Sequence, residues 1–219
     1  MKIIHGYILY ESMRKRHLPH IQPPDGIIFI TFRLANSLPK NVIDQLKFDY
    51  KSLVKLSKNN KQHKKIYDKK IHELINRYDL YLHKTSKGPF YLRKKEIADL
   101  VCNTMKYNDT KMYDLISYCV MPNHVHILFQ PNEISIEEYV PISNIMHSIK
   151  SFTANRANQI LGRKGQFWEH ESFDRYSRSD EDTIKIIRYI LDNPVVAGLV
   201  SKRENWPWSY VKKEFEKYL

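Results

Sequence analysis

The sequence predicts an α+β fold, in which short strands form a sheet and amphipathic helices pack on it. Three apolar runs of strand length, residues 27–34, 112–120 and 124–130, alternate with longer segments of helical periodicity. The second and third runs are separated only by the turn "MPN", which is typical of a β-hairpin. The 219 residues are enough for one sizeable core, so one domain is expected.

The first half of the chain is predicted to contain one strand and three helices. The run "GIIFITFRL" is bounded by Gly26 and the turn "ANSLPK", which indicates a largely buried strand at residues 27–34. Apolar side chains at three- and four-residue steps predict two helices within 42–82, separated by the polar "SKNNKQHKK", and a third helix in "RKKEIADLVCNTMKY". We expect a single domain, 1–219, with a core at about 26–40 and 111–210 and a helical insertion at about 41–110.

The second half continues from the hairpin with two more helices. The segment "VPISNIMHSIKSFTANRANQIL" predicts a helix with Pro141 near its first turn, and "FWEHESFDRYS" a short strand or extended stretch. "SDEDTIKIIRYILDN" predicts a helix that begins with Ser179 or Asp180 as N-cap and that ends at Pro194. The tail "ENWPWSYVKKEFEKYL" combines a Trp-Pro-Trp anchor with an amphipathic turn.

The composition favours a cytoplasmic protein with a polyanionic partner. Cys102 and Cys119 cannot build a disulfide framework, and no Cys-x-x-Cys pair indicates a structural zinc site. No stretch approaches the roughly 18 apolar residues of a membrane span, and no secretory leader is visible. The formal charge of +12 and the pI near 9.5 favour nucleic acid as the partner. The regularly spaced lysines of residues 47–70 either form a solvated helix face or contact phosphate.

Two histidines stand one residue apart in the apolar run "CVMPNHVHILFQP". Because side chains alternate between the faces of a strand, His124 and His126 share one face while Val125 points to the other. Two imidazoles about 7 Å apart along a strand can converge on one divalent ion if a third ligand arrives from elsewhere. The spacing by itself is equally compatible with histidines that only donate hydrogen bonds.

The helix before Pro194 contains a phenol and an amide on one face. Tyr189 and Asn193 are four residues apart and therefore lie one above the other, so both could reach one cavity. From the residues alone, Tyr189 is also compatible with a core aromatic and Asn193 with a helix terminator.

Five motifs, in order along the chain, resemble those of the single-tyrosine HUH transposases of insertion sequences, and especially their REP-associated tyrosine transposase branch. They are "MPNHVHIL", "SIKSFTA", "GQFWEHESFDRYSR", "IIRYILDNPVVAGLV" and "WPWSY". The resemblance covers the first strand and nearly everything from about Tyr113 to Tyr210. It implies the HUH nuclease fold, a ferredoxin/RRM-like central antiparallel sheet with helices packed on it.

The resemblance also implies roles for the candidate site residues. By motif, His124 and His126 become metal ligands, Tyr189 the nucleophile and Asn193 the third ligand. Related insertion-sequence enzymes commonly have Gln at the position of Asn193, whereas the REP-associated branch has Asn before Pro, as here. The implied activity is metal-dependent cleavage and rejoining of single-stranded DNA through a 5′-phosphotyrosine, on hairpin-forming repeats.

The expected cofactor and partners follow from this activity. Mg²⁺ or Mn²⁺ is expected rather than Zn²⁺, because a His₂-Asn site with open positions must accept phosphate oxygen. The expected partner is single-stranded or hairpin DNA, bound by a monomer or homodimer in a bacterial-type cytoplasm, in association with the nucleoid. Basic and aromatic side chains near the motifs are candidate DNA contacts: Lys150, Arg156, Arg163, Lys164, Arg188 and Trp168.

Several alternatives stay open at this point. Tyr176 in "FDRYSRSD" is a rival nucleophile, although its neighbours predict an extended segment and not the helix that Tyr189 occupies. Glu169 and His170 either lie near the site or cap a strand edge, and Trp206 and Trp208 either stack on bases or form a packing anchor. The chain could also be a non-catalytic DNA-binding module that keeps the fold, or a metal hydrolase of another fold.

Overall fold

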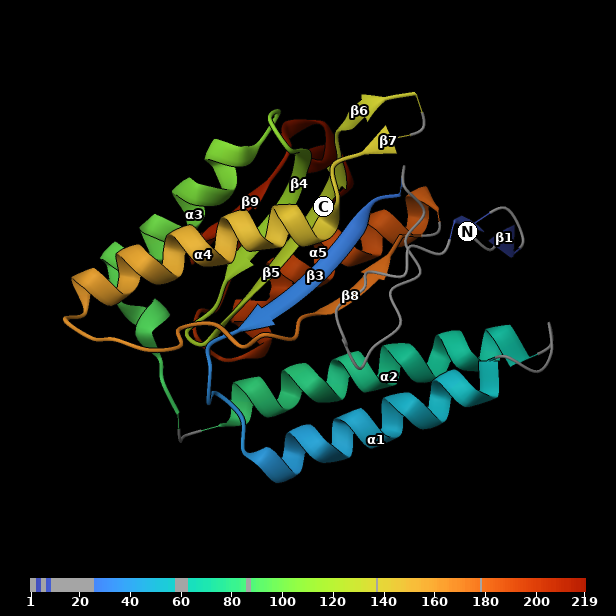
Figure 1. Ribbon diagram of the computed structural model, residues 1–219, viewed down its shortest axis with the longest axis horizontal. Helices are drawn as coiled ribbons and strands as arrows, with labels where there is room; N and C mark the ends of the chain where they lie inside the picture. Colours follow the sequence, from blue (N-terminus) through green and yellow to red (C-terminus); the bar gives the residue numbers. More distant parts are fainter. Residues whose placement is uncertain are drawn as a thin grey trace. The chain divides into compact units, whose positions relative to one another are not determined.

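The computed structural model describes residues 3–4, 7–8, 26–57, 63–85, 88–136, 138–177 and 179–219. The chain forms two compact units (Figure 1). The first unit comprises Phe90–Leu219 and the described part of Met1–Ala35, and the second is Asn36–Pro89. None of the helices in the described ranges is long and apolar enough to cross a membrane.

The centre of the first unit is a five-stranded antiparallel sheet. Its strands are β3 (Ile28–Arg33), β4 (Tyr113–Val120), β5 (His124–Pro131), β8 (Phe173–Tyr176) and β9 (Ser209–Val211). They are arranged in the order β8-β3-β5-β4-β9, and every pair is antiparallel. The predicted α+β fold with a central antiparallel sheet is confirmed, as are the first strand and the hairpin of β4 and β5.

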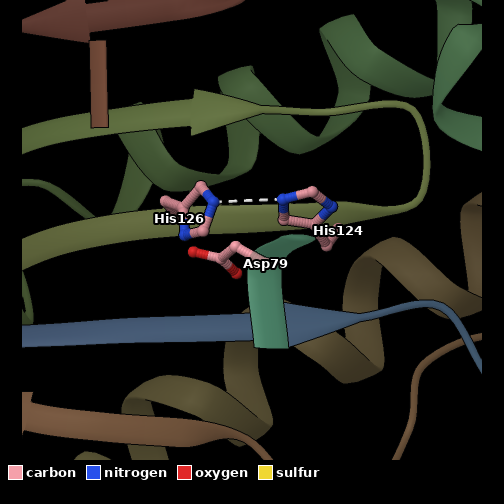
Figure 2. Close-up of side chains that lie close together, drawn as sticks. All are labelled: Asp79, His124 and His126. Carbon is pink, nitrogen blue, oxygen red and sulfur yellow. Dashed lines mark hydrogen bonds between the residues drawn. The ribbon is translucent and has the colours of Figure 1, made fainter. Parts of the chain in front are cut away.

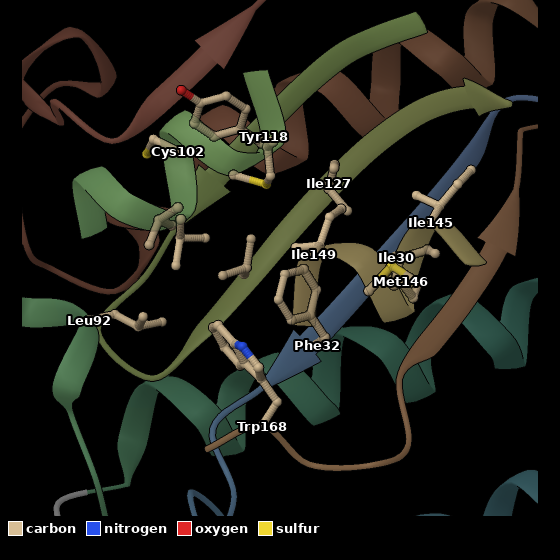
Figure 3. Close-up of a cluster of buried hydrophobic side chains, with 14 of the residues drawn as sticks. Ile30, Phe32, Leu92, Cys102, Tyr118, Ile127, Ile145, Met146, Ile149 and Trp168 are labelled. Carbon is tan, nitrogen blue, oxygen red and sulfur yellow. The ribbon is translucent and has the colours of Figure 1, made fainter. Parts of the chain in front are cut away.

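Helices cover both faces of this sheet (Figure 1). Helices α3 (Lys95–Asn108) and α4 (Ile142–Ile160) pack on one face, and α5 (Asp180–Val196) lies against β4 and β5. The cluster between the sheet and the helices α3 and α4 is apolar and contains every second residue of β3 and β5 (Figure 3): Ile28, Ile30, Phe32, Val125, Ile127 and Phe129. The other face of the same strands is therefore left for the side chains that alternate with these.

The second unit consists of α1 (Lys40–Ser57) and α2 (His63–Lys84), an antiparallel helical pair. These are the first two helices predicted for the insertion. The third predicted helix, α3, belongs to the first unit instead, because Ile97, Val101 and Met105 are buried against the sheet. The helical residues between β3 and β4 are thus divided between the two units. The side chains of most lysines within 47–70 lie outside the described residues.

The remaining elements are short. Strands β1 (Ile3–Ile4) and β2 (Tyr7–Ile8) pair with each other, as do β6 (Glu133–Ser135) and β7 (Glu138–Tyr139). The 3-10 turns are η1 (Tyr91–Arg93), η2 (Arg203–Asn205) and η3 (Lys213–Tyr218). In the Trp-Pro-Trp anchor, the Trp206 indole donates to the Val120 carbonyl and the Trp208 indole to Asp99. Both rings therefore fasten the tail to the first unit, which favours the packing interpretation.

The boundaries of α5 include one correction. Ser179 is the N-cap and its hydroxyl accepts from the Asp182 amide, in agreement with one predicted alternative. The predicted end at Pro194 is wrong, because the helix continues to Val196. The real terminator is Gly198, which has a φ of 69°. Its amide donates to Val195 and the next amide, of Leu199, donates to the carbonyl of Pro194. These two hydrogen bonds form the Schellman motif, which requires a residue in the left-handed backbone conformation.

Replacing Gly198 with alanine is expected to lower the free energy of unfolding by about 1 kcal/mol, because a Cβ disfavours the left-handed backbone. No heavy atom lies within 4 Å of the added Cβ, so the effect comes from the backbone and not from a clash. Urea unfolding of the full chain measures it. Gly198→Asn should lose less than Gly198→Ala, since asparagine tolerates this conformation, and equal stability of all three proteins would contradict the assignment.

Candidate functional site

The histidine pair lies on the sheet face that points away from helices α3 and α4. His124 and His126 are the first and third residues of β5, and their direct partners on β3 are Arg33 and Thr31. Val125, between them, belongs to the apolar cluster on the opposite face. The strand alternation predicted for these three residues is therefore confirmed.

Hydrogen bonds fix the orientation of both imidazoles. The Nδ1 atom of His124 lies 2.7 Å from Oδ1 of Asn123, and Nδ1 of His126 lies 2.8 Å from the Thr31 hydroxyl. If both Nδ1 atoms carry the proton and donate to these oxygens, both Nε2 lone pairs are available to a metal ion, whereas the hydrogen bond between the two Nε2 atoms needs a proton on one of them. The two Nε2 atoms face each other at 3.0 Å (Figure 2). Such outer hydrogen bonds are what orient histidine ligands in metal sites.

The separation of the two Nε2 atoms is short enough for both to bind one divalent ion. Two neighbouring ligands of one ion lie about 3.0 to 3.3 Å apart, in octahedral and in tetrahedral geometry respectively. The observed distance is 3.0 Å. The imidazole pair could therefore hold one metal ion and leave other positions for oxygen ligands. Asp79, also drawn in Figure 2, belongs to helix α2 of the second unit.

A cysteine thiol lies next to His126 on the same face of the sheet. Cys119 is the direct partner of His126 on β4, and its sulfur lies 3.6 Å from that of Met121. Burial raises the pKa of the Cys119 thiol to about 12, so the thiol is neutral at physiological pH.

Helix α5 brings Tyr189 against the histidine pair. The Tyr189 ring meets the His126 ring edge to face at 5.8 Å between centroids, and the Phe29 ring at 6.0 Å. Phe29 itself stacks on His126 at 5.7 Å with an angle of 14°. Among the described residues, the buried Tyr189 hydroxyl has no hydrogen-bond partner. The structure thus places a phenol with an unused donor and acceptor next to a candidate metal ligand.

Asn193 lies one turn beyond Tyr189 on the same helix. It is buried, and its Nδ2 atom donates to the Tyr189 carbonyl at 3.0 Å. The amide oxygen, Oδ1, is the end of this side chain that suits a metal. The predicted stacking of Tyr189 and Asn193 on one helix face is confirmed, while the role of Asn193 as a ligand stays a prediction.

The rival nucleophile lies on the other side of the sheet. Tyr176 is the direct partner of Ile28, and it packs against the apolar cluster under α3 and α4. Cross-strand partners share a face, so Tyr176 and the histidine pair project from opposite faces. This arrangement favours Tyr189 over Tyr176.

Two of the side chains that were expected to contact DNA, Lys150 and Trp168, make contacts within the protein. The Lys150 ammonium donates to the carbonyls of Glu169 and His170 and to the Ser172 hydroxyl. The Trp168 ring is 5% exposed, and its indole N–H donates to Thr153. Trp168 therefore has a packing role in this structure, in place of the base-stacking role that was expected.

The other basic candidates are closer to the surface. Arg156 donates to Gln159, and Lys164 is exposed. Arg163 donates to Asn158 and to the Gln166 carbonyl, which holds the turn after α4 together. Arg188, next to the nucleophile candidate, donates twice to the Tyr218 carbonyl and so binds the C-terminal turn. Each of these roles as a DNA contact stays a prediction.

Sequence reasoning missed the residues of β3 that face the histidines. Phe29, Thr31 and Arg33 alternate with the core residues of this strand, and each is buried. Their alternation was visible in "FITFR", but no sequence signal showed that this strand pairs with the histidine strand in this register.

Comparison with known proteins agrees with the motifs. The sequence model of the family described as "Transposase IS200 like" matches residues 81–193, which is more than half of the chain. A curated protein of Haemophilus influenzae, a candidate REP-associated tyrosine transposase, is 25% identical over 105 residues, which are 44% of this chain and 58% of that protein. The chain thus spans little more than half the length of this relative.

Two solved structures are also similar in part. One is a REP-associated tyrosine transposase bound to a REP hairpin, with a TM-score of 0.46, 16% identity, and coverage of 90% of this chain and 81% of the other. The other is a candidate transposase of Deinococcus radiodurans, with a TM-score of 0.32, 14% identity, and coverage of 76% and 89%. From the family match, which includes the histidine pair, Tyr189 and Asn193, we conclude that the chain belongs to the IS200-like transposase family.

Proposed function

We propose that this protein cleaves and rejoins single-stranded DNA in a metal-dependent reaction, with Tyr189 as the nucleophile and hairpin-forming repeats as the substrate. The observation that carries the proposal is the placement of the Tyr189 ring against His126, whose Nε2 atom lies 3.0 Å from that of His124. The candidate nucleophile thus lies beside the candidate metal ligands, in a protein of the IS200-like transposase family.

The reaction exchanges one phosphodiester for another. The Tyr189 oxygen attacks the scissile phosphorus, its proton passes to solvent, and the bond from phosphorus to the 3′ oxygen breaks. The 3′ oxygen takes up a proton and leaves as a 3′-OH, while the 5′ end of the other fragment stays on Tyr189. Because the number of phosphoester bonds is conserved, the reverse attack by a 3′-OH rejoins strands without a nucleotide cofactor.

The imidazole pair, with Asn193 as the proposed third ligand, would hold Mg²⁺ or Mn²⁺. A phenol of ordinary pKa near ~10 is a weak nucleophile at neutral pH, and the phosphodiester repels it through its own charge. A bound divalent ion would neutralise charge on the phosphate and orient it for in-line attack. These ions are preferred over zinc because a site of two imidazoles and an amide that also accepts phosphate oxygen has mixed ligand hardness and open positions.

The substrate assignment rests on charge and on the motifs. A net charge of +12 provides the long-range attraction that a nucleic acid needs. A single-stranded or bulged segment gives the nucleophile access to the backbone phosphate, and a hairpin supplies such segments at a defined place. The proposal therefore names hairpin DNA with single-stranded flanks as the substrate.

The expected result of a direct test is a covalent adduct that carries the 3′ fragment. The full chain is incubated with a pool of stem-loop oligonucleotides that have randomised single-stranded flanks, in Mg²⁺ or Mn²⁺. A 3′-fluorescein label should move onto the protein in a denaturing gel, and a 5′ label should not. EDTA should lower the adduct yield at least about a hundredfold. Oligonucleotides that stay intact in both metals would favour a non-catalytic DNA-binding protein instead.

A further inference from the structure

A buried arginine lies directly beside the histidine pair. Arg33 is the last residue of β3, its partner on β5 is His124, and it is only 4% exposed. Direct cross-strand partners have Cβ atoms about 5 Å apart on the same face. The long Arg33 side chain therefore begins within reach of any ligand that His124 helps to bind.

The guanidinium of Arg33 has a carboxylate partner. Its Nη2 donates to Oε2 of Glu169 at 3.1 Å, and the Glu169 side chain is 27% exposed. The backbones of the two residues also bond, from the Glu169 amide to the Arg33 carbonyl at 2.9 Å. Glu169 thus presents a partly solvated anion to a cation that is almost completely buried.

A buried ion pair is poorly explained by stability alone. Arg33 is removed from water while Glu169 stays partly solvated, and burying a charge carries a desolvation cost that apolar residues of similar volume avoid. The planar guanidinium fork binds two oxygens of a carboxylate or of a phosphate in the same geometry. An arginine at this position is therefore suited to exchange one oxyanion for another.

The segment that carries Glu169 keeps its place without the carboxylate. The Lys150 ammonium binds the backbone carbonyls of Glu169 and His170 and the Ser172 hydroxyl. Trp168 forms a bridge to Leu34. The other carboxylate oxygen, Oε1, already accepts from the His170 amide at 3.1 Å. If the Arg33 guanidinium left Glu169 for another anion, these backbone contacts would therefore remain. The released carboxylate would still accept the hydrogen bond from the His170 amide.

We propose that Arg33 is a phosphate-binding residue of the DNA site and that the Glu169 carboxylate holds its guanidinium until a DNA phosphate replaces it. The inference rests on the proposed function, because the phosphate belongs to the DNA substrate. Arg33 then neutralises the backbone phosphate next to the imidazole pair, and Glu169 lowers the affinity for other anions when DNA is absent.

The test uses variants that break the pair from either side. Arg33→Gln removes the positive charge, and Arg33→Lys keeps the charge but removes the planar guanidinium. Glu169→Gln removes the negative charge that competes with the phosphate. Asp114→Asn is the matched control, because Asp114 also pairs with a cation, Lys212 at 2.8 Å, and its loss changes the net charge equally. Binding of a 5′-fluorescein stem-loop oligonucleotide is measured by anisotropy in EDTA over a range of salt, with unfolding curves for each protein.

The Arg33 variants and the Glu169 variant are expected to change DNA affinity in opposite directions. Arg33→Gln should weaken DNA binding at least about tenfold. It should also reduce the slope of the logarithm of the binding constant against the logarithm of the salt concentration by roughly 0.7, the value for one phosphate contact. Arg33→Lys should weaken it less. Glu169→Gln should tighten binding about threefold or more beyond Asp114→Asn. If the pair were only structural, Glu169→Gln would remove one partner of a buried charge and would weaken DNA binding together with stability.

The outcomes separate this inference from the proposed function. If Glu169→Gln weakens binding, or does not exceed Asp114→Asn, or if Arg33→Lys binds like the wild type, the phosphate-binding role is wrong. The same holds if the wild-type protein does not bind the probe. Opposite shifts in a protein that forms no covalent adduct would support the Arg33 role and contradict the proposed reaction. If Arg33→Gln does not fold, the lysine and Glu169 variants decide the question.

Discussion

Tyr189→Phe is expected to abolish the covalent DNA adduct and to lower strand cleavage at least about a thousandfold. The variant removes only the oxygen that would attack the phosphate. The ring contacts to His126 and Phe29 remain, so the metal-binding nitrogens and the helix keep their places. The adduct yield on a 3′-labelled stem-loop oligonucleotide is the measurement, and mass spectrometry of the wild-type adduct should place the nucleotide on the Tyr189 peptide.

This variant is also expected to fold normally. The Tyr189 hydroxyl is buried and has no hydrogen-bond partner among the described residues, so its removal leaves no polar group unpaired. The free energy of unfolding should stay within about 1 kcal/mol of the wild type. Tyr176→Phe is the matched control, because Tyr176 projects from the opposite face of the sheet. An adduct that persists in Tyr189→Phe and disappears in Tyr176→Phe would reverse the assignment.

His124→Ala and His126→Ala are expected to weaken Mn²⁺ binding strongly and to reduce adduct formation at least about a hundredfold. Each variant removes one of the two Nε2 atoms that face each other at 3.0 Å. One imidazole and the proposed ligand Asn193 hold the ion less tightly than the full set, so both its affinity and its geometry are expected to suffer. A titration of free Mn²⁺ by electron paramagnetic resonance measures the binding without requiring cleavage.

Two further variants make this result specific. Thr31→Val removes the hydroxyl at 2.8 Å from the His126 Nδ1 but keeps both Nε2 atoms, so a smaller loss of about ten- to a hundredfold in Mn²⁺ affinity is expected. His147→Ala removes an exposed imidazole of α4 and should bind Mn²⁺ like the wild type. Unchanged Mn²⁺ binding in both His124→Ala and His126→Ala would contradict the metal site.

Local patterns in the sequence were sufficient to predict most elements of the first unit. The apolar runs at residues 27–34 and 124–130, the three-residue turn between the second and third strands, and the Ser179 cap all depend on neighbouring residues, and each agrees with the structure. The same local information failed at Pro194. A proline in the last turn lacks only an N–H, whereas the left-handed Gly198 provides the bonds that end the helix.

Packing over longer distances decided the limits of the insertion. The apolar stripe of residues 97–105 predicted a helix, but it did not specify whether that helix packs on the sheet or on its sequence neighbours. Burial of Ile97, Val101 and Met105 in the sheet cluster assigns α3 to the first unit. An apolar stripe shows that one face of a helix will be buried. Which element covers that face depends on the tertiary structure.

The sequence by itself determined the family, the His124 and His126 face of β5, and the stacking of Tyr189 above Asn193, because these depend on motif order and on the periods of strand and helix. Only the tertiary structure decided that Tyr189 meets His126, that Tyr176 lies on the other face, and that Thr31, Arg33 and Phe29 surround the imidazoles. Strand register and helix placement join residues more than sixty positions apart, and they result from burial of the whole core, which no local pattern encodes.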